Sequence, residues 1–176
     1  NYHAFVSLDG AIDFAQESEG IVTLIRDITV AEPVIIEEGQ TVVIKRNSKT
    51  ITGTMPKSVG AVVKNNGTLT IQNGTISSTA INGGAAALNK GTLTITDATV
   101  NGAPSNTAAG TASYAVNSQG AGSMLVVNNS TINGRGAIGA TKGTKVEING
   151  GVYHTPAVAW GHAVYADGEG TEVVIN

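Results

Sequence analysis

Cysteine is absent from this 176-residue chain, which excludes disulfide bonds, thiolate metal sites and cysteine nucleophiles. Charged residues make up only 13% of the chain and aromatic residues only 4%. The few Lys and Arg are scattered and the net charge is −3, so no basic surface for nucleic acid is expected. No apolar run approaches the roughly 18 residues of a membrane-spanning helix. Nucleic acid and membrane insertion are therefore not expected among the partners.

Glycine is abundant, with 23 residues, and it accompanies a short motif that recurs along the chain. In each copy two apolar residues alternate with Thr or charged residues, as in Gly67-Thr-Leu-Thr-Ile71. Period-two alternation places the apolar pair on one face of a strand, which we expect to be buried. Successive copies are 21 to 32 residues apart. The predicted buried pairs are Val42 and Ile44, Leu69 and Ile71, Leu93 and Ile95, Leu125 and Val127, Val146 and Ile148, and Val173 and Ile175.

Two further strands are expected in each repeat. The second starts after a corner of constant length that carries Asn, Asp or Gly, residues that tolerate left-handed backbone or bond their own main chain. Its inward residues are Ile76, Val100, Ile132 and either Tyr153 or Val152. The third is indicated by pairs of Ala with an aliphatic residue, at Ala61-Val62, Ala87-Leu88, Ala115-Val116, Ala137-Ile138 and Ala163-Val164.

Repeats with the same strand order predict a chain that coils and stacks equivalent strands in parallel, about 4.8 Å apart. We therefore expect an all-β fold, a parallel β-helix (β-solenoid) of about six to seven coils. A sandwich or antiparallel barrel would instead require hairpin turns that reverse the strand order. Before the first coil, residues 7–15 predict a short helix with Ser7 as N-cap and Leu8, Ile12 and Ala15 on its apolar face.

The segment Gly67-Thr-Leu-Thr-Ile-Gln-Asn-Gly-Thr-Ile76, preceded by Glu38-Gly-Gln-Thr-Val-Val-Ile44 and Lys49-Thr-Ile-Thr-Gly53, resembles the right-handed parallel β-helices of the pectate-lyase-like superfamily. The resemblance covers nearly the whole chain and is closer to the non-catalytic branch found in bacterial cell-surface and phage virion proteins. It implies a single right-handed domain in which residues 1–20 form an N-terminal helical cap and residues 21–176 the β-helix. It does not specify function, because the same coil hosts lyases, hydrolases, spikes and adhesins.

Catalysis on such a coil requires clustered acidic residues, either as acid and base or as calcium ligands. Between residues 59 and 146 the only carboxylate is Asp97, at a corner where Asx residues usually bond local backbone. Asp167 and Glu169 are too few to form a calcium cage, and weak calcium binding there stays open. We expect no catalytic residue, metal site or cofactor. The alternative is a polysaccharide lyase or hydrolase whose site is assembled from widely spaced coils.

Aromatic residues are missing between Phe14 and Tyr114 and gather late in the chain. The variable connection from Tyr153 to His162 is where a solenoid displays recognition residues. Aromatic rings there can stack on sugar rings while His bonds hydroxyl groups. The other interpretation is that Trp160 packs against the last coil or a neighbouring subunit. The candidate residues for glycan stacking or a subunit contact are Tyr153, His154, Trp160, His162 and Tyr165.

The last predicted strand, residues 173–175, would leave an open edge and an uncovered core at the end of the coil. Self-association or a further part of the chain is expected to cover it. Together these observations predict a non-enzymatic, extracellular structural and adhesive module of a bacterial cell-surface protein or phage virion, with a glycan or another host-surface ligand as partner. A phage head or tail fibre component with a purely assembly role is the second alternative.

Overall fold

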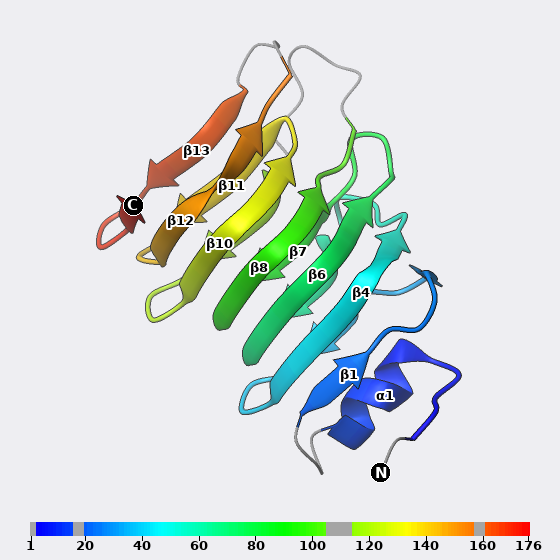
Figure 1. Ribbon diagram of the computed structural model, residues 1–176. Coiled ribbons are helices and arrows are strands. Elements are labelled where there is room, and N and C mark those ends of the chain that lie inside the picture. The colour runs from blue at the N-terminus through cyan, green and yellow to red at the C-terminus, as the bar shows by residue number, and fades with distance from the viewer. Residues whose placement is uncertain (1–2, 16–19, 105–113, 157–160) are drawn as a thin grey trace.

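The computed structural model describes residues 3–15, 20–104, 114–156 and 161–176, which form a right-handed parallel β-solenoid of about six turns (Figure 1). Sheet A has eight strands and sheet B has six. A helix, α1 (Leu8–Ala15), lies against the first turn. Sheet A comprises β1 (Ile21–Thr23), β2 (Ile28–Val30), β4 (Thr41–Gly53), β6 (Thr68–Ser78), β8 (Thr92–Asn101), β10 (Met124–Asn133), β12 (Lys145–His154) and β14 (Glu172–Ile175). Sheet B comprises β3 (Val34–Ile36), β5 (Ala61–Asn65), β7 (Ala85–Asn89), β9 (Tyr114–Gln119), β11 (Gly136–Thr141) and β13 (His162–Asp167).

The predicted register of sheet A is confirmed. Leu69 pairs with Leu93, and Leu93 pairs with Leu125, in parallel ladders. The column continues from Val42 at one end to Val146 and Val173 at the other. All the predicted inward pairs are buried except the last, because no described strand covers the far edge of β14. Ile175 is consequently 67% exposed.

The first turn has two short strands of sheet A, β1 and β2, as expected, but each turn from β4 to β12 contains one long strand instead. The corner residues Asn73, Asp97 and Asn129 have φ of 52°, 49° and 43°, so each turns the chain through a left-handed conformation. The parallel ladder continues on both sides of this corner, for example at Ile71 and Ile76. One left-handed residue per turn bends the strand while its neighbours keep their ladder hydrogen bonds. The predicted number of strands per repeat was therefore too high from β4 onward, although the predicted inward residues of these strands were right.

The third predicted strand of each repeat lies in sheet B, and at the pair Ala87-Leu88 it is the alanine that faces the core. Leu88 pairs with Lys64 and points outward, whereas Ala87 pairs with the buried Val63. Three consecutive alanines, Ala85–Ala87, are all buried at this point, so the inward positions are filled before Leu88 is reached. In β12 the inward residue is Tyr153, which packs against the core, whereas Val152 is 59% exposed.

The helix at the start is the one predicted. The backbone N–H of Gly10 donates to Ser7 Oγ at 3.2 Å, which makes Ser7 the N-cap. Leu8, Ile12 and Ala15 are buried and join the core of the solenoid. The helix lies against β1 and β3, so its apolar face covers the first turn.

A buried polar ladder runs between the two sheets. Asn65 Nδ2 donates to Asn89 Oδ1 at 2.8 Å, and Asn89 Nδ2 donates to Ser118 Oγ at 3.0 Å. Each amide also donates to a backbone carbonyl, those of Thr92 and Met124. These bonds tie successive turns together where sheet B leads back to sheet A.

Arg46 is the largest buried side chain and has an unusual environment. It is 0% exposed, and none of its three guanidinium nitrogens has a hydrogen-bond partner in the described structure. Burial lowers the pKa of Arg46 to about 10. Its Cβ lies beside Gly74, whose missing side chain leaves room for it.

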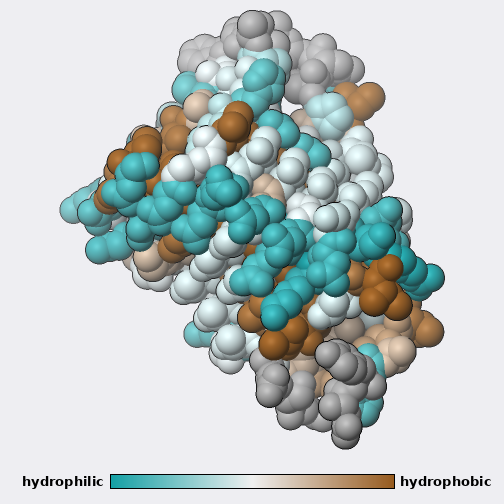
Figure 2. All heavy atoms as spheres, in the orientation of Figure 1, coloured by the Kyte–Doolittle hydropathy of each residue, from teal (hydrophilic) through white to brown (hydrophobic). Residues whose placement is uncertain are grey.

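The outer face of sheet A is mostly of intermediate hydropathy over its central strands, and hydrophobic residues are exposed toward the two ends of the stack (Figure 2). Threonines occupy many of the outward positions, among them Thr68, Thr70, Thr92 and Thr94.

Candidate functional site

Three rings gather on the outer face of sheet B, toward the C-terminal end. Tyr114 from β9 stacks on Tyr165 from β13, with ring centroids 5.9 Å apart and planes at 21°. The ring of His162, also from β13, lies 5.5 Å from that of Tyr165. We call Tyr114, His162 and Tyr165 the aromatic platform. Because all three stand on paired strands, their backbone positions are fixed by the sheet.

The platform exists because the strand between β9 and β13 lacks side chains where the rings lie. In β11, Gly136 pairs with Tyr114 and His162, and Gly139 pairs with Tyr165. A Cβ at Gly139 would lie 2.6 Å from Cδ2 of Tyr114, and one at Gly136 would also collide with that ring. The Tyr114 ring therefore lies directly over the β11 backbone. Glycine within a strand commonly marks such a close approach.

Polar side chains border the platform on the same three strands. Asn117 of β9 and Tyr165 of β13 both pair with Gly139 of β11. Two residues further along the strands, Gln119 and Asp167 both pair with Thr141. Amide and hydroxyl groups of this kind can donate and accept hydrogen bonds. The rim can thus bond the polar edge of a molecule whose apolar face rests on the rings.

The two tyrosines are held in their neutral forms. The negative charge of Asp167, followed by burial and a side-chain hydrogen bond to Asp167, raises the pKa of Tyr165. Burial, followed by the charge of Tyr165, raises the pKa of Tyr114. Neutral phenols keep their hydroxyl groups available as hydrogen-bond donors.

Tyr153 occupies a different environment from the platform. Its ring packs against the core, and its hydroxyl donates to the carbonyl of Gly150 at 3.0 Å. Burial raises the pKa of Tyr153 to about 12. The structure therefore places Tyr153 apart from His162 and Tyr165, although the sequence groups all three.

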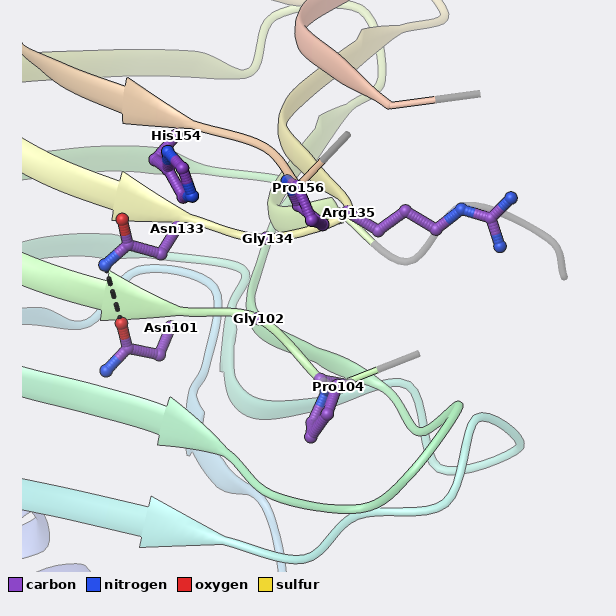
Figure 3. Close-up of a pocket in the computed structure, with 9 residues that line it drawn as sticks. Asn101, Gly102, Pro104, Asn133, Gly134, Arg135, His154 and Pro156 are labelled. Atoms are coloured by element: carbon purple, nitrogen blue, oxygen red, sulfur yellow. Dashed lines mark hydrogen bonds between the residues drawn. The ribbon is translucent and has the colours of Figure 1, made fainter. Parts of the chain in front are cut away.

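His154 lies on the other side of the solenoid, in a hollow of about 270 Å³ at the ends of β8, β10 and β12 (Figure 3). Asn133 Nδ2 donates to Asn101 Oδ1 at 2.9 Å, and Asn101 Nδ2 donates to Ser77 Oγ at 3.0 Å. Asn101, Asn133 and His154 follow one another on neighbouring strands, whereas the Arg135 side chain extends away from them. Glycine, alanine and proline residues make up most of the rest of its lining, and no stacked pair of described rings lies there.

Trp160 and Asp97 are the other residues that the sequence brought into question. Trp160 lies outside the described residues. Asp97 Oδ1 accepts a hydrogen bond from Asn129 Nδ2 at 2.8 Å, in the corner where the sequence put it. Among the described residues no three His, Asp or Glu side chains gather into a metal-binding group. The described part of the chain also contains no helix with the length and apolarity needed to cross a membrane.

A scan against protein-family models, a search of curated proteins and a search of solved structures each returned no match. The site is therefore interpreted from its own geometry. Sequence reasoning found two of the three platform residues and missed that Tyr114 joins them. The signal that could have found it is the pair Gly136 and Gly139 within a predicted strand, because strand glycines mark close approach of another group.

Proposed function

We propose that this protein is a non-enzymatic module that binds glycans through the aromatic platform on sheet B. The observation that carries the proposal is the stacked pair of Tyr114 and Tyr165, whose Tyr114 ring lies over Gly136 and Gly139 of β11. A pyranose ring has an apolar face of C–H groups and a rim of hydroxyl groups. Tyrosine rings offer the matching apolar surface, and Asn117, Gln119 and Thr141 offer the matching polar rim.

The rigidity of the platform supports binding of this kind. A small ligand contributes little contact area, so affinity depends on how little the protein must reorganise. Rings seated on paired strands lose less conformational freedom on binding than rings on a long loop. We expect micromolar to millimolar affinity for one site, which repeated copies on a surface would strengthen through avidity.

The biological setting belongs to the same proposal. The resemblance to non-catalytic β-helices favours a surface-exposed structural and adhesive role, in a bacterial cell-surface protein or a phage virion. The central turns offer no pair of carboxylates, since Asp97 is bonded to a corner asparagine, and this favours binding over hydrolysis. The proposed partner is accordingly a glycan outside the cell.

The proposal is tested by a glycan array followed by calorimetry on the sugars that bind. Tyr165→Ala should weaken binding at least about tenfold, because it removes one of the two stacked rings. Ile25→Ala is the matched control, since Ile25 is 82% exposed in the first turn, far along the stack from the platform. That variant should bind as the wild type does.

Two results would overturn the proposal. One is the absence of binding to every glycan on the array. The other is self-association that Tyr165→Ala abolishes while glycan binding is unchanged, because the rings would then form a subunit contact. Release of reducing or unsaturated sugar from a bound polysaccharide would overturn its non-enzymatic part.

A further inference from the structure

The charges around the aromatic platform are one-sided. Neither β9, β11 nor β13 contains a Lys or Arg, and Asp167 is the single carboxylate on these three strands. Asp167 is exposed, stands two residues beyond Tyr165 on the same face, and forms no ion pair with any residue that the structure describes. The platform therefore combines ring faces with one carboxylate, and His162 is the only basic side chain on these three strands.

We infer that the glycan bound at the aromatic platform is an amino sugar, whose protonated amine lies against the tyrosine rings and beside the carboxylate of Asp167. This inference rests on the proposed function and names the substrate class of the same site.

Two physical effects support the assignment. A cation is attracted to the electron-rich face of a tyrosine ring when it lies within about 6 Å of the ring centre. The same cation forms a charge-assisted hydrogen bond with a carboxylate, which is stronger than one between neutral groups. The two effects act together only where a ring and a free carboxylate are adjacent. Tyr165 and Asp167 are adjacent, since they stand two residues apart in β13 and their side chains lie on the same face of the strand.

The same charge disfavours acidic sugars. A uronate or sialate carboxylate seated on the platform would face Asp167, and like charges at close range repel. The nearest basic neighbours along the chain do not reverse this. Lys142 follows β11 in a turn with φ of 60° and forms no described ion pair with Asp167, while Arg135 is buried. The charge of Asp167 neither weakens nor strengthens the binding of neutral sugars.

The experiment compares three oligomers of equal length by calorimetry at about pH 5.5, where the amines of a glucosamine oligomer are mostly protonated. The oligomers are of glucosamine, of N-acetylglucosamine, whose amine is neutralised, and of galacturonic acid. We expect the glucosamine oligomer to bind roughly fivefold to tenfold more tightly than the N-acetylated one, and the galacturonate oligomer to bind most weakly. The preference should shrink as salt is raised from 0.05 to about 0.5 M, because screening weakens exposed charge pairs.

The variant Asp167→Asn keeps the shape of the side chain and removes its charge. It should bring the two hexosamine oligomers to nearly equal affinity, chiefly by weakening binding of the glucosamine oligomer. Asp97→Asn is the matched control, because it removes the same charge from an exposed corner of sheet A and should keep the preference.

The possible failures are distinct. Equal affinity of the wild type for both hexosamine oligomers, lost in Tyr165→Ala, would overturn the amino-sugar inference and leave the glycan-binding proposal standing. A preference that survives in Asp167→Asn would also overturn the inference. Absence of binding to all three oligomers and to every other glycan would overturn both.

Discussion

Arg46 offers the sharpest test of how the solenoid is held together. Its guanidinium is fully buried inside β4, just before the corner of that strand, and no described group accepts a hydrogen bond from it. A buried charge without a partner destabilises a fold, because the lost hydration is not replaced. Arg46→Met keeps an unbranched side chain of similar length and removes the charge. We therefore expect this variant to be more stable than the wild type.

The size of the effect follows from the pKa. Its lowering to about 10 corresponds to roughly 3 kcal/mol of destabilisation of the charged form in the folded state. For a chain of this length, a gain of that size raises the Tm by about 6 to 12 °C. Lys45→Met is the control, since Lys45 is exposed next to Arg46 and its replacement should change stability by less than about 0.5 kcal/mol.

The pH dependence gives an independent check. The folded-state pKa of Arg46 is below its unfolded-state value, so above about pH 10 the unfolded chain binds more protons and the wild type gains stability relative to the variant. The advantage of Arg46→Met should be constant near neutral pH and fall to about 2 kcal/mol at pH 11. Calorimetry and urea unfolding at both pH values measure this difference. A variant no more stable than the wild type at pH 7 would refute the reasoning.

Three further changes test other contacts. Ile95→Asp should lower the free energy of unfolding by at least about 3 kcal/mol, because Ile95 is fully buried. Thr94→Asp, on the outer face, should lower it by about 1 kcal/mol at most. Equal losses for the two variants in urea unfolding would contradict the register. Asn89→Ala should cost about 2 to 3 kcal/mol by orphaning buried hydrogen-bond partners, with the exposed Asn66→Ala close to neutral. Ser7→Ala should cost about 1 kcal/mol and speed amide exchange in α1, and unchanged exchange would rule out its N-cap role.

The inward positions of sheet A were predictable because alternation alone decides which face of a strand is buried. Once Leu69, Leu93 and Leu125 were aligned, the parallel ladder placed them in one column without further assumptions. The left-handed corner was equally visible, since Asn73 and its equivalents favour that conformation. What alternation could not reveal was that the strand continues through the corner, because ladder hydrogen bonds depend on the neighbouring turns.

The contacts that join different turns were harder to predict. The buried ladder had a visible signal, because Asn65 and Asn89 each stand two residues before a glycine that opens a strand of sheet A. The platform had a weaker one. Tyr114 and Tyr165 are about fifty residues apart, and only the register of β9, β11 and β13 shows that their rings meet over glycine. Because the connections between these strands differ in length, the register cannot be obtained by counting residues along the sequence.

Binding at the platform is the central claim, and a titration followed by two-dimensional amide NMR tests it most directly. The ligand is the oligosaccharide that binds most tightly on the array. We predict that the largest shift changes lie at Tyr114, Asn117, Gly139 and Tyr165, while amides of the sheet A strands β6 and β8 stay unchanged. Shift changes centred on the hollow around Asn133 and His154, or on the outer face of sheet A, would contradict the account.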